Sequence, residues 1–173
     1  ALECAGGRRP GWKGRNIRAG TWQRLEGVPV FGKTVGIIGL GGIGAEVARI
    51  AKGMGMKVIA WKRTPPTDAN MDMVELDSLL QKSDVVSLNL TLNGETRGFL
   101  DRTRIARMKP GVIFINHARG ALVDETALIE ALRSGHIRHA GTAVFHNGPP
   151  KASDPPHRMG EVPTAARPRS HHT

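Results

Sequence analysis

The sequence predicts an α/β protein built on a doubly wound parallel sheet of about five strands. From Lys33 onward, short β-branched or apolar runs alternate with amphipathic stretches of helical length, which is the pattern of βαβ units. The apolar runs are nearly continuous, as expected of strands that are covered on both faces. A glycine-rich segment, residues 39–44, follows the first run and opens the first helical stretch. We therefore expect helices on both faces of a parallel sheet.

The strands expected along the chain are all short runs rich in Val, Ile and other apolar residues. Each suits a buried position between two layers of helices. The expected strands are residues 34–38, 57–61, 84–88, 112–116 and 140–145.

The helices expected between these strands differ in how clearly they are patterned, and the last is the clearest. Asp124 can cap the amides of its first turn, and Gly135 supplies a left-handed stop after it. Leu128, Ala131 and Leu132 form its apolar face. The expected helices are residues 43–54, 75–81, 102–108 and 124–134.

Length and composition favour one folded domain with less regular segments on either side. The chain has 173 residues, of which 39% are hydrophobic and 23% charged, a globular composition with enough residues for one core. Residues 1–32 are rich in Gly and Arg and are expected to be a connecting segment. Residues 150–173 are rich in Pro and lack periodicity, so we expect an irregular tail. Residues 33–149 would then form the domain.

Several classes of protein are disfavoured by the composition. The longest apolar runs are far shorter than the roughly 20 residues of a membrane helix, and no signal segment opens the chain, so a cytoplasmic location is expected. Cys4 is the single cysteine, which leaves no partner for an internal disulfide or a redox pair. We expect no membrane, metal or redox-pair role.

The net charge of +10 is concentrated near the start of the chain, since residues 1–63 hold 12 Lys and Arg against 3 Asp and Glu. Such a surface could bind nucleic acid or another phosphate-bearing ligand. Only two aromatic residues, Trp12 and Trp22, lie among the arginines of residues 8–24, fewer than a series of base-stacking side chains would require. A solvated or partner-facing surface is therefore the preferred interpretation, and nucleic acid is not the expected partner.

The most informative local motif is G-x-G-x-x-G at Gly39, Gly41 and Gly44, which continues through Gly42 and Ile43 into a helix. The first glycine permits a tight turn, the second lets the backbone approach a pyrophosphate, and the third lets the helix pack on the strand. The helix N-terminus presents free amides to the phosphates. This context predicts a Rossmann-like dinucleotide site, with an adenosylmethionine site or a vestigial loop as alternatives.

The residues after the second expected strand bear on which dinucleotide is bound. An NAD site usually places a carboxylate there for the adenosine ribose, whereas this chain has Lys62, Arg63 and Thr64. Two cations would attract a 2′-phosphate, so the chemistry favours NADP over NAD. The alternative is that Lys62 and Arg63 are ordinary exposed loop residues.

Several separated blocks of the sequence resemble the cofactor domain of the D-isomer-specific 2-hydroxyacid dehydrogenases. They are GKTVGIIGLGGIGAEVARIAKGMGMKVIAW, SDVVSLNLTLNGETRGFL and ARMKPGVIFINHARGALVDETALIEALRSGHIRHAG, within residues 17–149. The resemblance implies a domain that binds NAD or NADP for hydride transfer between the coenzyme and a 2-oxo or 2-hydroxy acid. In that family a second, substrate-side domain completes the protein. We expect this chain to be the cofactor domain, truncated at both ends.

The resemblance also implies roles for individual positions around the coenzyme. The pyrophosphate contacts of the family fall on Gly42 and Ile43, and its ribose carboxylate falls on Lys62. The loop after the third expected strand borders the cofactor in the family. Its counterparts here are Leu90, Thr91 and Thr96.

The family's Asn-x-x-Arg-Gly block is residues 116–120, and by resemblance Arg119 binds the substrate carboxylate and polarises its carbonyl. A guanidinium at the carboxyl end of a parallel strand also lies where open α/β sheets hold ligands. The alternative is a surface arginine that pairs with Asp124 or Glu125. His117 and Ala118 are expected to line the cofactor, and His117 is not assigned to catalysis.

The acid/base machinery is where the chain departs from the family pattern. Ala143 stands where an aspartate is expected near the nicotinamide, Gly148 replaces a glutamate, and Arg167 aligns with the catalytic histidine. A substitute histidine would have to come from the irregular tail, where nothing in the sequence would hold it. The chain alone is therefore expected to be inactive or impaired, and to act on a 2-oxo acid only when a substrate domain completes it. The alternative is a non-catalytic dinucleotide-binding or dimerisation module, and a homodimer is one expected partner.

Overall fold

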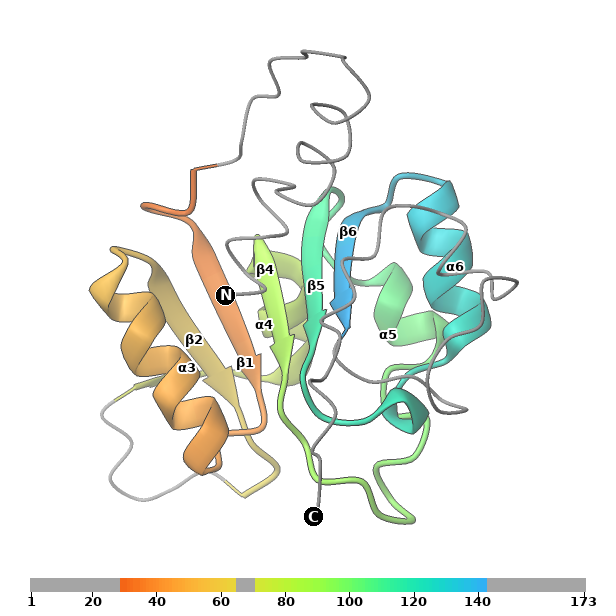
Figure 1. Cartoon of the computed structure of the whole chain (residues 1–173), viewed down its shortest axis with the longest axis horizontal. Coiled ribbons are helices and arrows are strands. Elements are labelled where there is room, and N and C mark those ends of the chain that lie inside the picture. The colour runs from red at the N-terminus through yellow and green to blue at the C-terminus, as the bar shows by residue number, and fades with distance from the viewer. Residues whose placement is uncertain (1–28, 65–70, 143–173) are drawn as a thin grey trace, which may run out of the picture.

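The fold is a six-stranded parallel sheet with the order β3-β2-β1-β4-β5-β6 (Figure 1). The computed structural model describes residues 29–64 and 71–142. Every neighbouring pair of strands runs parallel. The strands are β1 (Thr34–Ile38), β2 (Lys57–Trp61), β3 (Asp72–Met73), β4 (Val85–Leu88), β5 (Val112–Asn116) and β6 (Ile137–Thr142).

Helices cover both faces of this sheet, which confirms the doubly wound architecture. One face packs against α3, and the other packs against α4, α5 and α6 (Figure 1). A short 3-10 turn, Gly120–Leu122, precedes the last helix. The helices are α3 (Gly42–Gly53), α4 (Leu76–Lys82), α5 (Arg102–Ala106) and α6 (Glu125–Arg133).

The core forms two apolar clusters because successive strand side chains point to opposite faces. On the α3 face, Val35 and Ile37 of β1 pack with Ala48 of the helix. On the other face, Ile38 packs with Leu79 of α4. The continuous apolar character of the strands is thus explained by burial on both sides.

The strand predictions were correct for three strands, one residue too long at the start of β4, and incomplete for β3 and β6. The bounds of β1, β2 and β5 agree with expectation. The sheet has one strand more than expected, because β3 is two residues long and carries too little apolar pattern to be recognised. The expectation for 140–145 was wrong at its start: β6 begins at Ile137, and its polar residues Arg138 and His139 hid it. Residues 143–145 lie outside the described residues.

The helix predictions were correct to within one or two residues. Asp124 caps α6 by accepting a hydrogen bond from the Ala127 amide at 3.0 Å. Gly135 has φ +77°, the left-handed conformation expected after this helix. The helix at 102–108 is shorter than expected and ends at Ala106.

Some predictions can be examined only for the residues that the structure describes. Most of the connecting segment and the whole of the tail at 150–173 lie outside them. In the described ranges, no helix is long and apolar enough to cross a membrane. Those ranges also contain no group of three or more His, Cys, Asp or Glu side chains that could hold a metal ion.

At the amino edge of the sheet, the Asp84 carboxylate adds side-chain hydrogen bonds between strands. Asp84 Oδ2 accepts a hydrogen bond from the Thr34 amide at 2.9 Å, and its Oδ1 accepts one from Lys109 Nζ at 2.7 Å. Partial burial by itself raises the pKa of Asp84, but these two hydrogen bonds and the charges of Lys109 and Lys33 outweigh it, so the pKa is lowered. The carboxylate therefore joins β1 to the segment that leads into β5.

Candidate functional site

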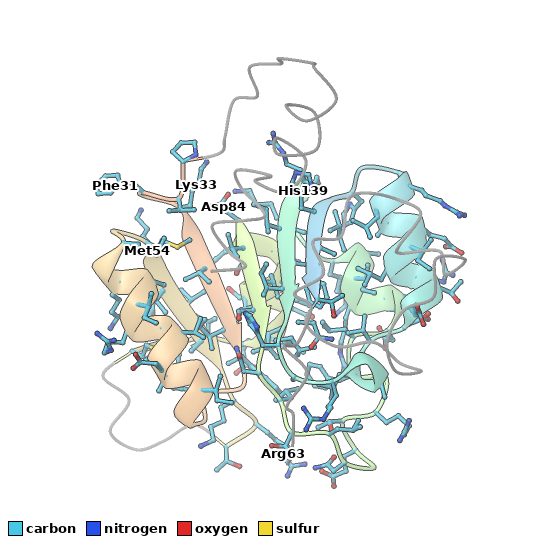
Figure 2. All side chains as sticks on the ribbon, in the orientation of Figure 1. Phe31, Lys33, Met54, Arg63, Asp84 and His139 are labelled. Carbon is cyan, nitrogen blue, oxygen red and sulfur yellow. The ribbon has the colours of Figure 1, made fainter. Side chains whose placement is uncertain are left out.

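The candidate site lies at the carboxyl edge of the sheet, where the turn after β1 meets the loops after β2, β4 and β5. Because the strand order runs outward from β1 in both directions, this is the topological switch point at which open α/β sheets bind ligands. Figure 2 shows Arg63 at this lower edge, and Lys33, Asp84 and His139 at the opposite edge. The predicted site residues within the described ranges therefore lie in loops at one end of the sheet.

The glycine turn contains two kinds of glycine. Gly39 has φ +96°, and a Cβ there would lie 2.9 Å from the backbone carbon of Asn89. A Cβ on Gly44 would lie 2.1 Å from the Gly39 carbonyl oxygen. By contrast, a Cβ on Gly41 or Gly42 would meet nothing within 4 Å. The outer glycines are thus required by the fold, and the inner two face open space.

The first turn of α3 lacks a side-chain cap. Its N-cap residue is Gly41, and no acidic residue occurs in the first turn. In α5 and α6 an aspartate accepts a hydrogen bond from a first-turn amide. The amides of α3 are therefore available to an anion, and the helix dipole favours one. Ile43 lies beside them with 71% of its surface exposed.

The residues after β2 form the second part of the site. The Gly39 amide donates a hydrogen bond to the Trp61 carbonyl oxygen at 2.9 Å, which fixes the end of β2 against the glycine turn. Lys62, Arg63 and Thr64 are all exposed. The guanidinium of Arg63 pairs with the carboxylate of Glu95. Sequence reasoning missed Glu95, because nothing near it in the chain indicates a partner 32 residues away.

The loop after β4 is organised by its own hydrogen bonds. The Thr96 hydroxyl donates to the Thr91 carbonyl oxygen at 2.7 Å. The amide oxygen of Asn93 accepts hydrogen bonds from the backbone amides of Glu95 and Thr96 at 3.0 and 2.9 Å. Leu90 is half-buried and Thr91 is exposed. The hydroxyl of Thr96 therefore shapes the loop, and its place beside the cofactor stays a prediction.

Asn89 is a second residue that sequence reasoning missed. Its backbone amide donates to the Ile38 carbonyl oxygen at 2.8 Å, which places it against the glycine turn. Its side-chain oxygen Oδ1 is buried and has no hydrogen-bond partner among the described residues. An acceptor in that position is uncommon unless a ligand or water supplies the donor. The sequence offered one signal for Asn89, since it is a polar residue directly after the apolar strand Val85–Leu88.

Arg119 is positioned by a turn that Asn116 closes at the end of β5. The Asn116 side chain donates to the Arg119 carbonyl oxygen and accepts from the Ala118 amide, both at 3.0 Å. The guanidinium of Arg119 is exposed and donates to the Ala118 carbonyl oxygen at 2.8 Å. In the described part of the chain it forms no ion pair with Asp124, which caps α6 instead. Ala118 and His117 are half-buried beside it.

Backbone hydrogen bonds join the loop after β4 to the segment after Arg119. The Leu100 amide donates to the Leu122 carbonyl oxygen, and the Asp124 amide donates to the Leu100 carbonyl oxygen, both at 2.9 Å. The Gly98 amide also donates a hydrogen bond to the Ala121 carbonyl oxygen. The two loops therefore act as one rigid border of the site. Ala143, Gly148 and Arg167 lie outside the described residues.

Comparisons with known proteins agree with this geometry. A family model described as the D-isomer specific 2-hydroxyacid dehydrogenase NAD binding domain matches residues 4–165. A hydroxypyruvate reductase of Thermotoga maritima is 44% identical over 138 residues, which are 78% of this chain and 45% of that protein. A D-3-phosphoglycerate dehydrogenase of Mycobacterium leprae is 42% identical over 155 residues, or 86% of this chain and 29% of that protein.

Solved structures give the same result. A glyoxylate reductase from Paecilomyes thermophila superposes with a TM-score of 0.83 at 40% identity, over 89% of this chain and 50% of that one. A D-isomer specific 2-hydroxyacid dehydrogenase from Xanthobacter autotrophicus, in complex with NADPH and MES, has a TM-score of 0.81 at 36% identity, over 93% of this chain and 53% of that one. The chain thus spans about half the length of these structures.

Proposed function

Because the chain belongs to the D-isomer specific 2-hydroxyacid dehydrogenase family and comprises its NAD binding domain, we propose that the glycine turn binds a nicotinamide dinucleotide for reduction of a 2-oxo acid. Gly41, Gly42 and the first-turn amides of α3 would hold the pyrophosphate. The residues after β2 would contact the adenosine ribose. The loop after β4 would border the coenzyme, and the loop after β5 would lie at its nicotinamide end.

The observation that carries this proposal is the contrast between the inner and outer glycines of the turn. Gly39 and Gly44 have no room for a Cβ, and a turn with a purely structural role would need glycine at these positions as well. Gly41 and Gly42 have ample room and ordinary backbone conformations, so the fold alone gives no reason for glycine there. Close approach of a ligand gives that reason. The buried, unpartnered Oδ1 of Asn89 supplies an acceptor at the same place.

The preference for NADP over NAD is part of the proposal. Lys62 and Arg63 are exposed at the end of β2. Two cations at that position favour a 2′-phosphate, and the ordinary NAD site would hold a carboxylate there instead.

Arg119 is assigned to the substrate carboxylate in this proposal. The coenzyme supplies or accepts the hydride when bound, and the exposed guanidinium would grip a 2-oxo acid by two parallel hydrogen bonds. The turn closed by Asn116 holds the Arg119 backbone, so the side chain starts from a fixed point at the carboxyl edge. Ala143, His117 and Ala118 would line the coenzyme without a proton-transfer role.

Turnover also needs a general acid. The positions at which the family's acid/base residues are expected hold Ala143, Gly148 and Arg167 instead. A positioned acid or base contributes about 10² to 10⁴ in rate, so the chain by itself would bind coenzyme with little or no reduction. A module that only binds dinucleotide is the second candidate, favoured by the same substitutions. Association of two copies and a cytoplasmic location stay predictions.

The test is a titration of NADPH and NADH into the full chain, read by nicotinamide fluorescence, with Gly41→Val as the variant. Gly41 has φ −97°, which valine adopts without strain, and its side chain would project into empty space. We expect a small loss of thermal stability, because valine is a poorer N-cap than glycine. The affinity for both coenzymes should fall by about tenfold or more, because the added methyl groups occupy the pyrophosphate position.

The matched control is Gly53→Ala, which also adds a Cβ in open space but at the far end of α3. Its affinity for both coenzymes should equal that of the wild type. Equal affinity of the wild type and Gly41→Val would contradict the proposed site. Adding glyoxylate, pyruvate or hydroxypyruvate then separates an enzyme from a binding module.

A further inference from the structure

We propose that Glu95 tunes the coenzyme preference by acting as an internal anion that occupies Arg63 until a 2′-phosphate displaces it. The proposal rests on the proposed function, since it concerns the adenosine end of the same site. It adds a specificity-determining residue from the loop after β4, on the other side of the glycine turn from Lys62 and Arg63.

The geometry that supports this is an ion pair between two loops. Arg63 follows β2 and Glu95 follows β4, and both strands are direct neighbours of β1. The guanidinium and the carboxylate therefore join the loops that flank the glycine turn on its two sides. Figure 2 shows Arg63 at the carboxyl edge, where a dinucleotide would be bound.

Glu95 is held in place to make this contact. Its backbone amide donates to the Asn93 side-chain oxygen at 3.0 Å, and the Thr96 hydroxyl closes the same loop onto Thr91. The loop is also joined to the rigid segment after β5 through Gly98. The loop thus fixes the backbone of Glu95 beside the glycine turn, and its carboxylate pairs with Arg63 from the segment after β2.

The charges decide how the pair acts on a coenzyme. Lys62 and Arg63 carry two positive charges, and Glu95 offsets one of them. The side chains of Arg63 and Glu95 are 74% and 70% exposed, so the pair is weak enough to be broken. A 2′-phosphate is a stronger, doubly charged acceptor for the guanidinium than one carboxylate. Once displaced, however, the Glu95 carboxylate would stay near the phosphate and repel it.

The consequence is an affinity for NADPH that is lower than the two cations alone would give. NADH carries a ribose hydroxyl at the same place and has little interaction with either charge. Removing the carboxylate should therefore act on NADPH selectively. A purely structural ion pair would affect both coenzymes equally, through the shape of the loop.

The experiment is a titration of NADPH and NADH into the full chain and into Glu95→Gln, which keeps the size of the side chain and removes its charge. We expect NADPH affinity to rise about three- to tenfold and NADH affinity to change less than about twofold. The gain should shrink as ionic strength rises from about 0.05 to 0.5 M, because exposed charges are screened.

Arg63→Ala and the double variant with Glu95→Gln complete the test. Without Arg63, the substitution of Glu95 should raise NADPH affinity by clearly less than in its presence, since the competition for the guanidinium is gone. Equal NADPH affinities of wild type and Glu95→Gln, with both coenzymes bound, would overturn the role of Glu95 and leave the proposed function intact. Failure of the wild type and all variants to bind either coenzyme would overturn both.

Discussion

The two edges of the sheet are built from the same strands and treat their polar groups in opposite ways. At the amino edge, Asp84 satisfies the Thr34 amide and Lys109 with short hydrogen bonds inside the protein. At the carboxyl edge, α3 begins without a side-chain cap, and the side-chain oxygen of Asn89 has no partner among the described residues. The Asp84 carboxylate is thus satisfied within the protein, whereas the groups named at the carboxyl edge are those that the proposed coenzyme would engage.

This difference separates stability from binding within one small domain. Hydrogen bonds at the amino edge join elements that are distant in sequence, so their loss is expected in the free energy of unfolding. The open glycines and exposed cations at the carboxyl edge contribute little to folding, so their loss is expected in coenzyme affinity. A substitution at the amino edge should therefore change the free energy of unfolding, and a substitution of a ligand-facing residue at the carboxyl edge should change coenzyme affinity.

The largest effect is expected at Gly44, which lies at the carboxyl edge but serves the fold. In Gly44→Ala the new Cβ would lie 2.1 Å from the backbone carbonyl oxygen of Gly39, which cannot move without displacing α3 from β1. We expect a loss of about 3 kcal/mol in the free energy of unfolding, measured by urea denaturation. Gly53→Ala, on the same helix, should leave it unchanged or slightly raised. Similar stabilities of the two variants would show that the turn is not packed as described.

Asp84→Asn should have the next largest effect, and it should depend on pH. Replacing the carboxylate weakens the hydrogen bonds from Lys109 and Thr34, with an expected cost of about 1 to 2 kcal/mol at pH 7. The folded-state pKa of Asp84 is lowered, so its stabilisation is complete above the unfolded value of about 3.9 and is lost as the pH falls through the folded value.

Urea denaturation at pH 7 and at pH 3 measures this difference. The gap between wild type and Asp84→Asn should be clearly smaller at pH 3, and NADPH affinity at pH 7 should be equal in the two proteins. A gap that stays constant over this range would contradict the charged role of Asp84.

The smallest effect is expected at Thr96, whose hydroxyl bonds the Thr91 carbonyl oxygen and accepts from the Asn93 amide. Thr96→Val keeps the shape of the side chain and should cost about 0.5 to 1 kcal/mol of stability. Coenzyme affinity should change less than about threefold, because the hydroxyl shapes the loop. A loss of tenfold or more in NADPH affinity at unchanged stability would instead indicate direct contact with the coenzyme.

The sequence was sufficient for most of the fold because the strands are buried on both faces and therefore apolar throughout. Runs such as Val112–Asn116 can be recognised as strands from the sequence, whereas β3 has two residues and β6 has polar residues at its second and third positions. The glycine turn after β1 and the place of Arg119 after β5 were also predicted, because their neighbours in the chain carry the signal, and their roles in binding stay predictions. Glu95 and Asn89 were missed, since their significance depends on Arg63 and Gly39, which are close in space and distant in the chain.

Local residue order by itself therefore determined the alternation of strands and helices, the turn at Gly39 and the position of Arg119 after a strand. Backbone conformation and burial periodicity are properties of neighbouring residues, so they can be read along the chain. Only the tertiary structure decided that Gly41 faces open space while Gly44 does not, and that Arg63 meets a carboxylate from another loop. Those facts depend on which segments the folded sheet brings together, and distances between such segments are absent from any local pattern.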